Sequence, residues 1–132
     1  MLVLSAACVG ARTTTVTIGS HVFHVQVAAT EALREHGLMG VKTLAADHGM
    51  LFVWNDVAPR EFCMKDTVIP LDLISIDAGA VVAVTTMVPC KADPCPITDT
   101  PSADAALEVP AGTAQRAGIS AGARVESAAL TR

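Results

Sequence analysis

The chain alternates strand-length apolar runs with short polar breaks, and its most apolar part runs from Gly49 to Asp77. Isolated single charges interrupt this part, which is typical of a sheet core with a polar mouth. Nearer the N-terminus, period-two alternation around Gly19-Ser20 predicts a β-hairpin over residues 16–28. Further strands are predicted over residues 50–54, 61–65, 71–76, 81–88, 106–109 and 124–130, with a turn over residues 55–59.

Two short helices interrupt the predicted strands. Thr30 is a favourable N-cap for a helix over Glu31–Glu35, and Gly37 is a typical residue at which such a helix ends. A second helical turn over residues 113–117 stops at Gly118. Because strands dominate, the pattern predicts a mainly β fold, a small β-barrel or sandwich with two short helical insertions.

The length of 132 residues corresponds to one domain. We predict that residues 1–13 are a signal remnant or tether and that residues 14–132 form a single β-rich domain. The segment from Leu4 to Cys8 resembles a bacterial lipoprotein cleavage box, which makes Cys8 a lipidation candidate. The alternative is an apolar N-terminus with an incidental cysteine. The first interpretation predicts an exported or envelope-associated protein that touches a membrane only through such an anchor.

The charge of the chain narrows the range of partners. The net charge is −4, the pI is about 5.4, and no stretch concentrates Lys or Arg. Nucleic-acid-binding proteins need a basic face that neutralises phosphates, so no nucleic acid partner is predicted. The expected partner is a small molecule or an envelope protein.

A Pro- and Cys-rich loop over residues 89–104 is longer than most connections, and such loops are often functional. In an exported protein, Cys90 and Cys95 within this loop predict a disulfide. A metal site would need two further ligands, and no histidines have a metal-binding spacing, so no metal or cofactor is predicted. Cys63, between Phe62 and Met64, is predicted to be a small buried apolar residue.

Five motifs in a fixed order resemble the prokaryotic domain of unknown function 192 family: GLM at 37–39, GMLFVW at 49–54, FCMKDTVIPLDLISID at 62–77, PC…DPCP at 89–96 and ALEVPAGTAQRAGI at 106–119. The similarity extends from about Val22 to Val125. It implies a compact β-barrel-like or sandwich fold, and relatives of which many are exported or carry lipoprotein signals. It implies no established activity, so no catalytic residue is transferred from the family.

Four polar residues near the apolar strands are the candidate ligand-binding residues: Arg60, Lys65, Thr67 and Asp72. In one interpretation they form a polar cluster at the mouth of the barrel, where Lys65 or Arg60 meets an anionic group of a ligand. In the other, Asp72 accepts backbone N–H bonds and fixes the bend at Pro70, and Lys65 pairs with Asp72.

Three hypotheses about function follow. The first is a non-catalytic ligand-binding or accessory module, because no nucleophile elbow, phosphate loop or dinucleotide motif is present. The second is an enzyme of unassigned type, such as a hydrolase, that uses Lys65 and Asp72 with Glu108 or His48 as the base. The third is a structural subunit of an envelope assembly. No catalytic residue is assigned, and the first hypothesis is favoured.

Overall fold

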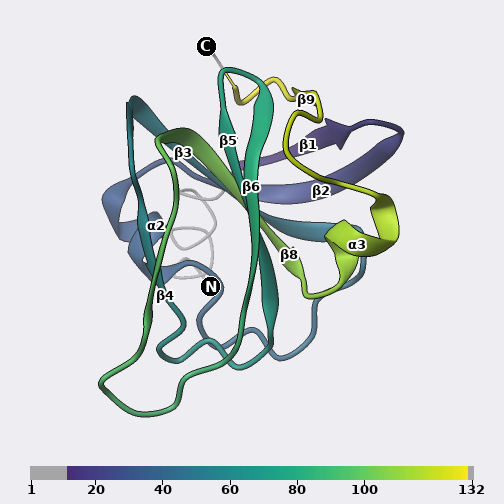
Figure 1. The fold of residues 1–132 in the computed structure, drawn as a ribbon. Coiled ribbons are helices and arrows are strands. Elements are labelled where there is room, and N and C mark those ends of the chain that lie inside the picture. The colour runs from purple at the N-terminus through teal and green to yellow at the C-terminus, as the bar shows by residue number, and fades with distance from the viewer. Residues whose placement is uncertain (1–11, 131–132) are drawn as a thin grey trace, which may run out of the picture.

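The computed structural model describes residues 12–130, in which strands predominate and two short helices occur (Figure 1). The predicted mainly β fold with two short helical insertions is confirmed. The elements are β1 (Arg12–Ile18), β2 (His21–Ala28), α2 (Glu31–His36), β3 (His48–Ala58), β4 (Glu61–Cys63), β5 (Leu71–Asp77), β6 (Ala80–Met87), β7 (Ile97–Asp99), β8 (Ala103–Pro110), α3 (Thr113–Ala117) and β9 (Val125–Glu126).

Seven strands form one sheet in the order β6-β5-β8-β3-β2-β1-β9, and this sheet curls into a half-barrel (Figure 1). The strands β4 and β7 form a separate two-stranded sheet. Neighbouring strands are antiparallel except β2 and β3, which are parallel. A parallel pair cannot be joined by a tight turn, so residues 29–47 cross over between the two strands and carry α2 with them.

Apolar side chains are buried on both faces of the large sheet. Along β3, Leu51 belongs to a cluster that α3 helps to close, whereas Phe52 belongs to a second cluster on the side of α2 and β4. Alternation along a strand directs successive side chains to opposite faces, so both faces need apolar residues. This explains why β3 and β8 carry apolar residues at consecutive positions, as at residues 50–54 and 105–107.

The helix α2 forms where the sequence predicts it. The Thr30 hydroxyl accepts a hydrogen bond from the Leu33 amide at 3.2 Å, and the Gly37 amide donates to the Leu33 carbonyl at 2.9 Å. These two bonds satisfy backbone groups at both ends of the helix. Within residues 12–130, no helix is long and apolar enough to cross a membrane.

Three local predictions are wrong. The predicted turn over residues 55–59 lies largely within β3, because a register shift against β8 between Val53 and Ala58 lets the strand continue. The predicted loop over residues 89–104 contains β7, which is too short to show a periodic pattern. The predicted last strand over residues 124–130 is reduced to the two residues of β9.

Gly49 sets the spacing between β3 and β8. A Cβ atom at this position would fall on the Glu108 carbonyl oxygen and would lie 3.0 Å from Val109 Cγ1. Only glycine allows the two backbones to approach this closely. The close contact fixes Glu108 in the middle of the sheet, beside Met50 of β3 and Leu73 of β5.

Candidate ligand-binding cleft

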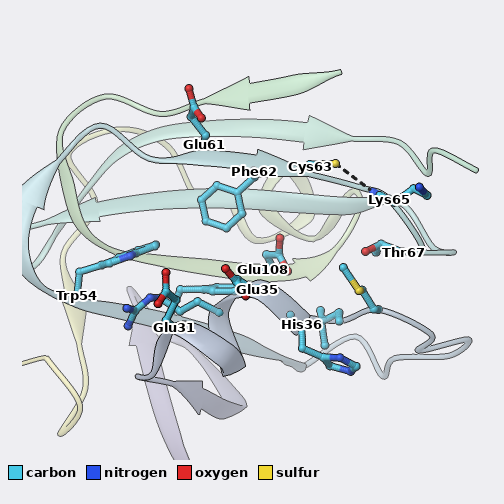
Figure 2. Close-up of a pocket in the computed structure, with 15 residues that line it drawn as sticks. Glu31, Glu35, His36, Trp54, Glu61, Phe62, Cys63, Lys65, Thr67 and Glu108 are labelled. Atoms are coloured by element: carbon cyan, nitrogen blue, oxygen red, sulfur yellow. Dashed lines mark hydrogen bonds between the residues drawn. The ribbon is translucent and has the colours of Figure 1, made fainter. Parts of the chain in front are cut away.

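A cleft of about 420 Å³ lies between α2 and the strands β3, β4 and β8 (Figure 2). The crossover between β2 and β3 places α2 on one side, and the short strand β4 provides the opposite wall. Figure 2 shows acidic and aromatic side chains among those that line the space: Glu31, Glu35, Trp54, Glu61, Phe62 and Glu108. The cleft therefore combines groups from segments far apart in the sequence.

Glu108 belongs to the lining of this cleft and is the most unusual residue in it. Alternation along β8 places its side chain on the same face as Ala106, in the apolar cluster that includes Met50 and Leu73. Only 5% of the residue is exposed, and within residues 12–130 its carboxyl group makes no hydrogen bond or ion pair. Burial raises the pKa of Glu108 from 4.5 to about 7. No protein group pairs with this carboxyl group, and its oxygens keep some contact with the cleft, because no fully enclosed side-chain oxygen of the described residues lacks a partner.

Three of the four aromatic residues of the chain meet at the cleft. The Phe52 and Trp54 rings are stacked with centroids 6.4 Å apart, and Phe62 presents an edge-to-face contact to each, at 5.3 Å and 6.2 Å. Such contacts hold the rings in fixed orientations. The result is a rigid aromatic wall of the cleft, with Trp54 next to α2, whose Arg34 lies over its ring.

The cleft has an excess of uncompensated negative charge. The carboxylates of Glu31, Glu35 and Glu61 have no hydrogen-bond or ion-pair partner in the described part of the chain. The two strongly basic side chains of the lining are already engaged. Lys65 Nζ donates to Asp93 at 2.7 Å, and Arg34 donates to the Val53 carbonyl at 2.9 Å.

Two of the four predicted ligand-binding residues, Lys65 and Thr67, line this cleft. Arg60 lies behind its wall, with the guanidinium 4.3 Å from the Trp54 ring centroid. The same guanidinium donates to the Ala103 carbonyl at 3.0 Å and to the Asp56 carbonyl at 2.6 Å. Arg60 thus holds Trp54 in place from behind and joins β3 to β8. Whether Lys65 and Thr67 contact a ligand stays a prediction.

Asp72 lies on the opposite face of the sheet and does not line the cleft. Its carboxylate accepts hydrogen bonds from the Gly112 and Ala114 amides, both at 3.0 Å, and from the Thr86 hydroxyl at 2.7 Å. The prediction that Asp72 accepts backbone N–H bonds is confirmed, although these bonds anchor the start of α3 rather than the bend at Pro70. The predicted Lys65–Asp72 pair is wrong, because alternation places the Asp72 side chain on the α3 side, away from Lys65.

The cysteines lie in two different environments. Cys90 and Cys95 form the predicted disulfide. The prediction that Cys63 is buried is wrong: it is exposed and lines the cleft, because β4 belongs to the small outer sheet and not to the core sheet. Cys8, the lipidation candidate, lies outside the described residues.

The residues proposed for catalysis are only partly brought together. Lys65 and Glu108 line the same cleft, whereas Asp72 and His48 do not. The His48 ring lies in a different groove, 5.5 Å from the His24 ring, and its Nδ1 is 2.9 Å from an Asp47 carboxylate oxygen. Among residues 12–130, no group of three or more His, Cys, Asp or Glu side chains could hold a metal ion.

The family model for domain of unknown function 192, described as "Uncharacterized ACR", matches residues 14–127. The chain belongs to this family. The resemblance drawn from the five sequence motifs is thereby confirmed, and the match covers nearly all of the described domain.

Two crystal structures are similar to this family member. The first, a candidate transcription regulator from Sinorhizobium meliloti 1021, is 33% identical with a TM-score of 0.84, covering 92% of this chain and 98% of that one. The second, a protein of unknown function from Novosphingobium aromaticivorans DSM 12444, is 34% identical with a TM-score of 0.75, covering 88% of this chain and 84% of that one. None of the curated proteins matches the chain significantly.

Proposed function

We propose that this domain binds a small organic molecule in the cleft between α2 and β4. The observation that carries the proposal is the Glu108 carboxyl group, which is buried in the cleft lining and has no partner within residues 12–130. A ligand that donates a hydrogen bond to this group would give it a partner that residues 12–130 do not provide.

The size and lining of the cleft support the same proposal. Its volume of about 420 Å³ lies within the range of small-molecule sites, roughly 300–1,000 Å³. Phe62 and Phe52 offer apolar surface for the body of a ligand, and Glu108 offers one strongly directional polar contact. Apolar walls with a few well-placed polar groups are typical of such sites.

A fragment screen by NMR tests the proposal. Trp54 is the only tryptophan in the chain and lines the cleft, so its fluorescence also reports binding there. We expect hits to shift amide signals of α2, β4 and β8. Phe62→Ala should reduce the affinity of these hits about tenfold through lost apolar contact. Val84→Ala, which shortens an exposed apolar residue on β6, is the matched control and should change nothing. Hits that map elsewhere, or none at all, contradict the proposal.

A second candidate function is acid–base catalysis in the same cleft. A carboxyl group with a pKa of about 7 can both release and accept a proton near neutral pH. Cleft ligands from the screen can be incubated with the protein and followed by NMR. If a ligand is converted and Glu108→Gln abolishes the conversion, the domain is an enzyme. If the ligands stay unchanged, the result favours binding without catalysis.

We further infer that the domain works in an oxidising compartment, as an exported or envelope-associated protein. The Cys90–Cys95 disulfide supports this, since such bonds are rare in the reducing cytosol. Fractionation of the native host, with free thiols blocked before lysis, tests it. We expect the protein in the envelope fraction with this disulfide intact, and a reduced cytosolic protein would overturn the inference.

We do not extend a regulatory role from the Sinorhizobium meliloti relative to this chain. The net charge of −4 does not favour contact with DNA phosphates. A gel-shift experiment with mixed-sequence DNA at low salt should show no complex.

A further inference from the structure

We propose that the ligand of the α2–β4 cleft is an organic cation, an ammonium or guanidinium group on an apolar body, whose charged group meets Glu108. This assignment rests on the proposed binding function and names the chemical class of its ligand.

The unpaired charge of the cleft lining is mainly negative. Carboxyl groups reach the cleft from three separate elements: Glu31 and Glu35 from α2, Glu61 from β4 and Glu108 from β8. None of the four has a hydrogen-bond or ion-pair partner in the structure of residues 12–130. An electrostatic field of this sign concentrates cations and repels anions.

The protein's own cations do not pair with these carboxyl groups. The Lys65 ammonium group is held by Asp93 at 2.7 Å, on the disulfide loop. Arg34 donates to the Val53 carbonyl, and its guanidinium lies 5.6 Å from the Trp54 ring centroid. Neither forms an ion pair with a cleft carboxylate. The charge of Arg34 remains in the lining, but it stands against four carboxyl groups, which leaves room for a cationic ligand.

Glu108 lies among apolar side chains. It is 5% exposed and shares its face of the sheet with the apolar cluster that contains Phe52. A charged hydrogen-bond donor is the strongest available partner for a buried carboxylate. A neutral donor would compensate the charge less fully, and an anion would add repulsion.

The aromatic wall supports the same class. Arg34 and Arg60 both lie over the Trp54 ring, which shows that cations already pack against this wall. Phe62, which extends into the space from β4, has no such partner in the described residues (Figure 2). Its ring can accept an ammonium group or cover the apolar body of the ligand.

The arrangement of the carboxylates favours an organic cation over a metal ion. No three acidic, histidine or cysteine side chains of the described chain converge at metal-binding distances. The carboxylates instead surround a space of about 420 Å³ that is walled by rings. A larger cation can meet Glu108 at one point and the outer carboxylates at others.

The test compares three soluble probes that share a phenyl ring and a short chain: 2-phenylethylammonium, 2-phenylethanol and phenylacetate. Binding is measured by Trp54 fluorescence and by amide shifts. We expect the ammonium to bind at least about tenfold more tightly than the alcohol, and the carboxylate not to bind, because a charged hydrogen bond is about twice as strong as a neutral one.

Variants assign the effect to the cleft. Glu108→Gln should reduce ammonium affinity about tenfold and leave the alcohol almost unchanged. Glu126→Gln removes the same charge from β9, outside the cleft, and should have no effect. If Glu108→Gln fails to fold, Glu35→Gln on the exposed face of α2 should show a smaller loss that disappears at high salt.

The outcomes separate the two proposals. Equal binding of ammonium and alcohol in the cleft overturns the cationic class but leaves the binding function standing. Preference for phenylacetate, or no ammonium binding at millimolar concentration, also overturns the class. The binding function itself fails only if the fragment screen finds no ligand in the cleft.

Discussion

Replacing Glu108 with Gln should make the stability of the domain less dependent on pH. Burial raises the pKa of Glu108 from 4.5 to about 7, so the folded protein holds this proton more tightly than the unfolded chain. At 1.36 kcal/mol for each pKa unit, the difference corresponds to about 3 kcal/mol.

The sign follows from which state binds the proton. Below about pH 4.5 the carboxyl group is neutral in both states, and its burial costs little. Between about pH 4.5 and pH 7 the unfolded chain releases the proton while the folded protein keeps it, so stability falls as the pH rises. Above about pH 7 the folded protein carries the buried charge, and the loss of about 3 kcal/mol is complete.

Urea denaturation at about pH 4 and about pH 8 measures this effect. The free energy of unfolding of the wild type minus that of Glu108→Gln should decrease by about 3 kcal/mol between the two pH values. Contributions from the histidines and the exposed carboxylates cancel in this difference. Glu35→Gln, which removes an exposed carboxylate of α2, should follow the wild-type curve. Parallel pH dependence in the wild type and Glu108→Gln would refute the reasoning.

Three further predictions concern stability and are checked by urea denaturation. Asp72→Ala should lower the free energy of unfolding by about 3 kcal/mol, because it leaves amides at the start of α3 without their acceptor. It should not change ligand affinity. Gly49→Ala should lower the free energy of unfolding by more than about 3 kcal/mol, because its Cβ would meet the β8 backbone. Gly19→Ala should lower it by only about 1–2 kcal/mol. Its Cβ would meet nothing within 4 Å, and only its φ of +61° is unfavourable. Replacing Cys90 and Cys95 together by Ser should cost about 2 kcal/mol, the value for so short a closed loop. Each explanation is contradicted by one result. These results are equal losses of stability for the two glycine variants, a changed ligand affinity for Asp72→Ala, and unchanged stability without the disulfide.

The fold could be predicted well because each local signal agreed with the tertiary structure. The hairpin around Gly19-Ser20 and the helix between Thr30 and Gly37 form where their turn and cap residues indicate. The errors lie where pairing partners decide the outcome. The register shift within β3 and the pairing of β7 with β4 depend on strands distant in the sequence.

The cleft could not be predicted from the sequence in the same way. Proximity along the chain suggests a common site for Lys65, Thr67 and Asp72. In the structure, Asp72 packs against the start of α3, whereas Lys65 lines the cleft. Glu108 does give a signal, a single carboxylate within the apolar run of β8. Whether this carboxylate lines a site depends on the strand order, which places β8 between β5 and β3. It also depends on the position of α2, which lies on the same face of the sheet as Glu108.

The most direct test of the account is an NMR titration of the Glu108 side-chain carboxyl carbon, assigned by its absence from Glu108→Gln, with and without 2-phenylethylammonium. The free protein should show a Glu108 pKa of about 7, because the carboxyl group is buried without a protein partner. The amine should lower this pKa, because a bound cation stabilises the charged form. A carboxyl group that titrates near 4.5, or whose pKa does not respond to the amine, would contradict it.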